Sequence, residues 1–334
     1  MKKIVEDFPN LSALESQFEL VLQSSLSDFL ETTNSRREEV IGSRRYTVVS
    51  LLFSVAIIFA LYVLYNNGQT KLNNILIGFS MLWLTVVFVS GRRWMTNDKL
   101  LAKEINLALV PALTNTLNRM ILYINNESHR EETLGLLNQS ELITSHDITV
   151  ISDDMYTIFS DKEVSLRELL VTQKYSTNSG KNTEERTLFK GLFVTTKLTK
   201  AHEAETYIST EGDKLGFGHL DFWTSLLSTN EVKETVLEWN DFEKNLHVAT
   251  SDATAAREIL TPEFMAVLND WWLEHKLNIR ISFKGEYMYM LLPETSIKID
   301  TSTTSTKLAT IKKYAWSLMR PMWRSLSLIE NLAR

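Results

Sequence analysis

The stretch YTVVSLLFSVAIIFALYVLY, Tyr46–Tyr65, decides the fold, because it holds twenty residues without a single Asp, Glu, Lys, Arg or His. At about 1.5 Å per residue, a helix of this length spans about 30 Å, which is the thickness of the bilayer hydrocarbon. A second uncharged run, Ile75–Ser90, follows the polar segment NNGQTK and is extended by Leu72. Two such runs leave no polar face for water, so the sequence predicts a transmembrane hairpin with spans at 46–65 and 72–90.

Basic residues mark the outer ends of both runs. They are Arg36, Arg37, Arg44 and Arg45 before the first run and Arg92 and Arg93 after the second, whereas the connecting loop holds only Lys71. Because such residues stay on the cytoplasmic side, we expect a multi-pass protein of the bacterial inner (cytoplasmic) membrane with both termini in the cytoplasm. The first run begins about 45 residues into the chain, so a cleavable signal peptide is not expected.

The amino-acid composition excludes several classes of function. The chain of 334 residues is 44% hydrophobic and 23% charged, which is typical of a folded protein. A net charge of −6 argues against nucleic acid as a partner, because phosphate binding needs an excess of Lys and Arg. The absence of cysteine excludes disulfides, thiolate metal sites and thiol catalysis.

Amphipathic helices are predicted on both sides of the hairpin. One apolar stripe recurs every three or four residues before it, at Leu11, Leu14, Phe18, Leu22, Leu26 and Phe29, and another follows it, at Leu100, Leu101, Ile105, Leu109, Leu113, Leu117, Ile121 and Leu122. Pro111 is expected to kink the second helix. The two stripes pack on each other as a stalk in the interpretation that we favour, and on the later domain or a partner chain in the alternative.

From about Ser140 the pattern changes to short β-like runs. Strands are predicted at Ile148–Ile151, Met155–Phe159, Leu169–Tyr175, Leu188–Leu198 and Glu205–Ser209, with a turn at Asp153 and Asp154 and a loop at Gly212–Gly218. Helices are predicted at Asp252–Leu260 and at Pro262–His275, the latter with Thr261 as N-cap. Ile279–Phe283 and Tyr287–Leu292 read as a hairpin around Gly285. The fold class is therefore α+β, with a mainly antiparallel sheet and helices.

The last segment reads as one amphipathic helix. Its apolar positions fall on one face, Lys313, Arg320 and Arg324 fall opposite, and Trp316 and Trp323 lie toward one flank. This pattern suits a helix on an anionic membrane leaflet, whereas a terminal helix packed on the domain is the interpretation that we favour. Both interpretations stay open.

The chain shows no sequence motif for catalysis. Its histidines, at positions 129, 146, 202, 219, 247 and 275, form no metal-spaced cluster. The Gly212–Gly218 loop lacks the order of a phosphate-binding loop, and no nucleophile-elbow or kinase motif occurs. No catalytic residue, metal or cofactor is predicted.

Two segments resemble a known family. They are LFKGLF at Leu188–Phe193 and DFEKNLHVATSDATAAREILTPEFM at Asp241–Met265. They are similar to the bacterial membrane family catalogued as domain of unknown function 3137, with Leu246 in place of a more usual Phe. The matching positions are Phe242, Glu243, Lys244, Val248, Asp252, Ala256, Arg257, Leu260, Thr261 and Pro262. The resemblance runs from about Ser140 to Leu292 and includes the hairpin. It implies no activity and no catalytic residues.

Arg257 and several tryptophans are the candidate interaction residues. Arg257 either pairs with Asp252 or Glu263 as a structural clamp or presents its guanidinium to a lipid phosphate or a partner carboxylate. Tryptophan is typical of cores and interfaces, which also holds for Trp223 and Trp239. The candidate interaction residues are Arg257, Trp271, Trp272, Trp316, Arg320, Trp323 and Arg324.

The sequence thus predicts a membrane-anchored cytoplasmic interaction module with a scaffold, assembly or regulatory role and an unidentified protein partner. The alternative is a membrane-associated lipid- or ligand-handling protein or enzyme with a site in the α+β domain; a transporter or channel is a distant third, because neither span carries a charge. The expected parts are a cytoplasmic amphipathic helix at 1–45, the hairpin at 46–90, a helical stalk at 91–135, the cytoplasmic α+β domain at 140–300 and an amphipathic helix at 306–334.

Overall fold

The computed structural model describes residues 11–32, 34–67, 70–125, 129–143, 148–152, 154–159, 162–176, 183–210, 226–227, 231–235, 237, 239, 242, 245–293 and 308–332. The chain divides into two compact units. Unit 1 comprises 1–21, 110–298 and 313–334, and unit 2 comprises 22–109 and 299–312. Helices α1 (Leu11–Thr32), α3 (Thr70–Leu117) and α9 (Leu308–Leu332) have residues in both. The predicted Gly212–Gly218 loop, Asp153, His146, His219 and Trp223 lie outside the described residues.

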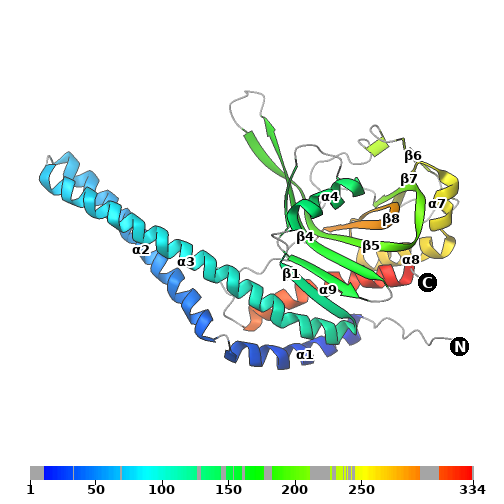
Figure 1. The fold of residues 1–334 in the computed structure, drawn as a ribbon, viewed down its shortest axis with the longest axis horizontal. Coiled ribbons are helices and arrows are strands. Elements are labelled where there is room, and N and C mark those ends of the chain that lie inside the picture. The colour runs from blue at the N-terminus through cyan, green and yellow to red at the C-terminus, as the bar shows by residue number, and fades with distance from the viewer. Residues whose placement is uncertain are drawn as a thin grey trace. The chain divides into compact units, whose positions relative to one another are not determined.

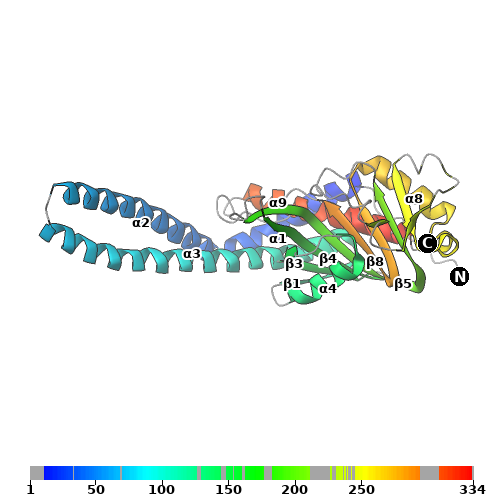
Figure 2. The same ribbon diagram turned by 90° about the horizontal axis from the view of Figure 1, so that it is seen from above.

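Unit 2 is built on α2 (Asn34–Asn66) and the first part of α3, which lie side by side and antiparallel (Figure 1, Figure 2). Among the α2 side chains that the structure describes, the buried ones are Val40, Thr47, Ser50 and Ile57, and their spacing of seven and three residues is typical of two helices that pack at a shallow angle. The indole Nε1 of Trp83 in α3 donates a hydrogen bond to the Ser50 carbonyl oxygen in α2 at 3.2 Å, which links the two helices.

The rest of the α2 surface is apolar and exposed. Among the described residues, one helical segment is long and apolar enough to cross a membrane, Arg36–Val63, and its most apolar stretch has a mean hydropathy of 2.3. Only 17% of its most apolar stretch is buried, unlike the core helix of a soluble fold. Its outward side chains, each 44–67% exposed, are Val48, Val49, Leu51, Leu52, Phe53, Val55, Ile58 and Phe59. The first predicted span therefore forms a helix with the expected length and apolar surface.

The second predicted span lies inside α3, which continues without a break to Leu117. The expected stripe does not end as predicted, because Ile121 and Leu122 belong to a strand, β1 (Met120–Asn125). Asn118 has a φ of 49°, a left-handed backbone conformation that ends the helix, and the sequence MILYIN then continues as a strand.

Unit 1 contains an antiparallel sheet, as predicted. The strands are β1, β2 (Ile148–Ile151), β3 (Asp154–Phe159), β4 (Glu163–Ser176), β5 (Thr183–Thr210), β6 (Lys233–Glu234), β7 (Leu246–Thr250) and β8 (Arg280–Pro293). They pair in the order β1-β3-β4-β5-β7-β6, with β2 beside β4 and β8 beside β5. The strands predicted at Leu188–Leu198 and Glu205–Ser209 are parts of the single strand β5.

The predicted hairpin around Gly285 is wrong, because β8 is one strand that pairs along β5. Phe283 lies opposite Thr206 and Tyr287 lies opposite Lys197, so the chain keeps its direction through the bend. Gly285 has a φ of 57°, which only glycine adopts without cost. The glycine therefore marks an irregularity inside a strand rather than a reversal.

Helices cover both faces of this sheet. α4 (Arg130–Ser140) contributes Leu137 to a core with Leu169, Phe193 and Leu291 on one face. On the opposite face Phe264 of α8 (Pro262–His275) lies edge-on to Phe283 of β8, with ring centroids 5.8 Å apart. Tyr314 of α9 adjoins Tyr156 of β3. Figure 2 shows α4 and α9 on opposite sides of the strands. The sheet is thus buried on both faces.

The remaining helices are placed by local signals. The Thr261 hydroxyl accepts a hydrogen bond from the Phe264 amide at 3.2 Å, and Pro262 occupies the first turn, so α8 begins where predicted. α7 (Ala253–Ile259) is capped by the Asp252 carboxylate, which accepts from the amides of Thr254 and Ala255.

Candidate functional site

The tryptophans predicted as interaction residues meet first at the junction of α8 and α9. The ring of His275 lies between Trp271, at a centroid distance of 4.9 Å, and Trp323, at 5.6 Å, with both pairs edge-on. Trp271 Nε1 donates to the carbonyl oxygen of Arg324 at 3.1 Å. Trp271 and Trp323 are each only 6% exposed. These two tryptophans and the Arg324 backbone therefore join α8 to α9 inside unit 1.

Buried polar atoms follow one stripe of α8. Asn269 Oδ1, Trp272 Nε1 and His275 Nε2 have no hydrogen-bond partner among the described residues. Burial lowers the pKa of His275, Arg324 acts in the same direction, and Glu274 opposes them. The imidazole is therefore neutral at pH 7, and its ring serves the packing of the junction.

Trp316 and Arg320 form a second cluster, where α9 meets α1. Phe18 of α1 lies edge-on to Trp316 at 4.9 Å. The Arg320 guanidinium lies 5.4 Å from the Trp316 ring centroid and pairs with Glu15 at 3.0 Å. The first half of α1 thus packs on the C-terminal helix, a contact that neither sequence interpretation of this stripe named. The face of α9 that carries Trp316 is occupied by the chain itself.

Arg257 and Trp272 stay at the surface. Arg257 is exposed on α7 and forms no ion pair with any described residue. The Asp252 carboxylate caps the helix instead, so the predicted clamp between the two is not formed. Trp272 is half-buried, and Lys276 Nζ lies 4.1 Å above its ring centroid. Of the predicted set, Arg257 and Arg320 are exposed, and Arg320 is already paired with Glu15.

Sequence reasoning missed a polar network under α4. Lys284 Nζ pairs with Glu141 at 2.8 Å and with Glu205 at 3.1 Å, and the Tyr207 hydroxyl donates to Glu141. Burial, followed by the hydrogen bond to Glu141, raises the pKa of Tyr207, so the phenol remains a donor. Because one lysine holds both carboxylates, neither is placed as a free general base. The network joins β5, β8 and the end of α4.

Two buried arginines extend this polar layer. Arg280 is fully buried and donates from Nη1 to the Leu142 carbonyl oxygen at 3.1 Å. Arg167 donates to Thr195 at 3.0 Å and to Glu132 at 3.2 Å, and burial lowers its pKa. Fully buried arginine is rare, and no sequence signal distinguished these two from surface arginines. Among the described residues no group of three or more potential metal ligands occurs.

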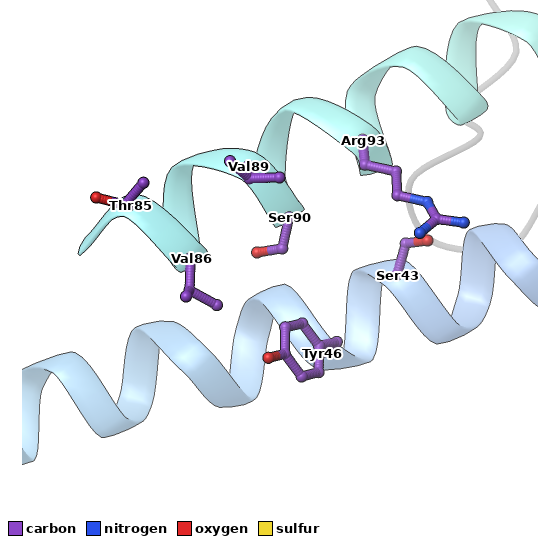
Figure 3. Close-up of a pocket in the computed structure, with 7 residues that line it drawn as sticks. All are labelled: Ser43, Tyr46, Thr85, Val86, Val89, Ser90 and Arg93. Atoms are coloured by element: carbon purple, nitrogen blue, oxygen red, sulfur yellow. The ribbon is translucent and has the colours of Figure 1, made fainter. Parts of the chain in front are cut away.

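Unit 2 contains a groove between α2 and α3, which sequence reasoning also missed. Its volume is about 360 Å³, and its lining residues are Ser43, Tyr46, Thr85, Val86, Val89, Ser90 and Arg93. Figure 3 shows Arg93 reaching from α3 toward Ser43 of α2, with Val86 and Tyr46 farther along between the helices. In the sequence analysis, Arg93 served only to predict which side of the membrane the chain termini face.

Comparison with known proteins identifies a family for the second half of the chain. Residues 187–333 match the model of the family described as "Protein of unknown function (DUF3137)". The predicted family is thus confirmed over these residues. The match begins within β5, later than the expected start at Ser140, and includes α9, which the resemblance did not.

No curated protein matches the chain. Among solved structures, the crystal structure of the mycobacterial trehalose monomycolate transport factor A, TtfA, is similar over 58% of this chain and 92% of that chain, with 10% sequence identity and a TM-score of 0.30. A likeness at this TM-score supports no statement about function.

Proposed function

We propose that this chain is a bacterial inner-membrane protein whose α2–α3 hairpin crosses the bilayer twice and holds an α+β interaction domain in the cytoplasm. The observation that carries the proposal is the outward apolar surface of α2. Eight large apolar side chains at 44–67% exposure form a patch that soluble monomers rarely present to water. A bilayer satisfies such a surface, and helices can cross it because their backbone groups bond internally.

The ends of the hairpin support the same placement. Arg44, Arg45, Arg92 and Arg93 lie together at one end of the apolar segments, because the two helices are antiparallel. Asn66 and Asn67 lie at the other end. Basic residues on one side and a short polar turn on the other favour termini in the cytoplasm.

Single cysteines test this topology without background, because the natural chain holds no cysteine. Thr96→Cys, Ile58→Cys and Asn67→Cys are each made in the full chain and treated with a membrane-impermeant maleimide in right-side-out inner-membrane vesicles. We expect labelling of Asn67→Cys alone, labelling of Thr96→Cys only after the vesicles are opened, and no labelling of Ile58→Cys without denaturant. Equal labelling of all three positions in closed vesicles would refute the hairpin.

The interaction role rests on Arg257, which is exposed and forms no ion pair with a described residue, and on Trp272, which is half-buried. A full-length protein in mild detergent is expected to retain one protein partner in a constant ratio. Replacing both residues by alanine should lower that retention about tenfold, since exposed arginine and tryptophan are typical hot-spot residues. Lys190→Ala, which removes an exposed charge on β5, serves as the control and should change nothing. Unchanged retention in the double variant would exclude both residues from the binding site.

A further inference from the structure

The groove between α2 and α3 has a wall suited to a hydrocarbon chain. Its serine and threonine hydroxyls are already bonded within their own helices: Ser43 donates to the Glu39 carbonyl oxygen, Ser90 to that of Val87 and Thr85 to that of Met81. They therefore offer no free donor to a polar ligand. What remains toward the groove is the methyl surface of the two valines and Tyr46, whose ring carries one hydroxyl.

One end of the groove is cationic. Arg93 donates from Nη2 to Glu39 at 2.7 Å, and its other guanidinium N–H groups have no partner among the described residues. Its side chain is 68% exposed, so these donors are accessible. Arg44, Arg45 and Arg92 lie at the same end of the helices and, together with Arg93, outnumber Glu38 and Glu39, so the region stays positive. An arginine fork matches the geometry of a phosphate.

We propose that this groove binds one anionic phospholipid of the inner leaflet. The phosphate lies at the free N–H groups of Arg93, and one acyl chain follows Val86, Val89 and Tyr46 toward the bilayer centre. The inference rests on the proposed membrane placement, because only then does Arg93 lie at headgroup depth. One end of the groove is positive, and along the rest the wall is mainly apolar, because its serine and threonine hydroxyls are already hydrogen-bonded. Both features favour a lipid over free phosphate or a soluble polar ligand.

Native mass spectrometry of the full chain in detergent tests the site. Palmitoyl-oleoyl phosphatidylglycerol and phosphatidylcholine are offered at equal concentration, so that only the headgroup differs. We expect about fivefold preference for phosphatidylglycerol, because one basic residue near an anionic headgroup contributes about that factor. Arg93→Gln should abolish the preference. Arg92→Gln is the matched control: it removes the neighbouring charge, which does not line the groove, and should keep the preference.

Filling the groove separates a site from general attraction by the basic end. Val86→Phe places a larger side chain between the helices and should remove retention of both lipids, whereas Leu84→Phe, at an exposed position outside the groove, should not. Equal loss in Arg92→Gln and Arg93→Gln, or full retention in Val86→Phe, would overturn the proposal. Failure of the membrane placement is recognised separately, because cysteine labelling would then place Ile58 in water.

Discussion

Replacing Ile58 and Phe59 of α2 by lysine is expected to keep the chain out of the membrane. Both side chains are more than 60% exposed, at 65% and 67%, near the middle of the apolar run. A lysine at the centre of a spanning helix costs about 2.5–3.5 kcal/mol, so the pair costs about 5–7 kcal/mol. In a protein surrounded by water the same exposed substitutions would change stability by less than about 0.5 kcal/mol each. The double substitution should therefore prevent insertion if α2 lies in a bilayer, and should have little effect if α2 lies in water.

The measurement is the fraction of the chain that stays in the membrane pellet after an alkaline carbonate wash. The double variant should fall from nearly complete retention to a small residue. Leu20→Lys is the control, because Leu20 is 73% exposed on α1, outside the apolar run, and its replacement should leave retention unchanged. Retention of the double variant at the level of the natural chain would show that α2 does not lie in the hydrocarbon.

Arg280→Ala is expected to destabilise the α+β unit by about 3–5 kcal/mol. The substitution removes a large, fully buried side chain and leaves the Leu142 carbonyl oxygen without its donor. Cavity formation and a buried unsatisfied acceptor both contribute to this cost. The expected readout is a lower midpoint of guanidinium unfolding, followed by tryptophan fluorescence of the full chain in detergent.

Two further variants make the Arg280 result interpretable. Arg257→Ala removes an exposed arginine without an ion pair to any described residue and should shift stability by less than about 0.5 kcal/mol. Arg280→Met restores much of the volume without the charge and should lose less than alanine. If alanine at 280 cost no more than alanine at 257, the contact with Leu142 would not hold the sheet to the end of α4.

Elements fixed by local chemistry could be predicted from the sequence. α8 has the predicted bounds because the Thr261 cap and Pro262 act within one turn. β2 also matches, since its apolar run is short and bounded by polar residues. The first apolar helix was evident because twenty uncharged residues suit few other environments.

Features that depend on distant pairing could not be predicted in the same way. Gly285 carries the same signal whether the chain turns back or continues, and only the pairing of β8 with β5 decides between them. The sequence favours packing of the α9 tryptophans on the domain but also fits lipid contact, and contacts with α1 and α8 decide that Trp316 and Trp323 pack within the chain. Arg167 and Arg280 look like surface residues until the sheet places them under α4.

The bend at Gly285 also constrains how this chain can change in length. Before it, Ser282 points to the face that carries α4, where its hydroxyl donates to the Ser140 carbonyl oxygen. After it, Tyr289 and Leu291 point to that same face. In a regular strand only residues separated by an even number of positions share a face, whereas both of these lie an odd number of positions after Ser282. The alternation of side chains therefore changes phase within the bend. Loss or gain of one residue there would move the side chains in the second half of β8 to the opposite face of the sheet. Over evolution, insertions and deletions at this site should therefore survive in pairs, whereas single-residue changes should be eliminated.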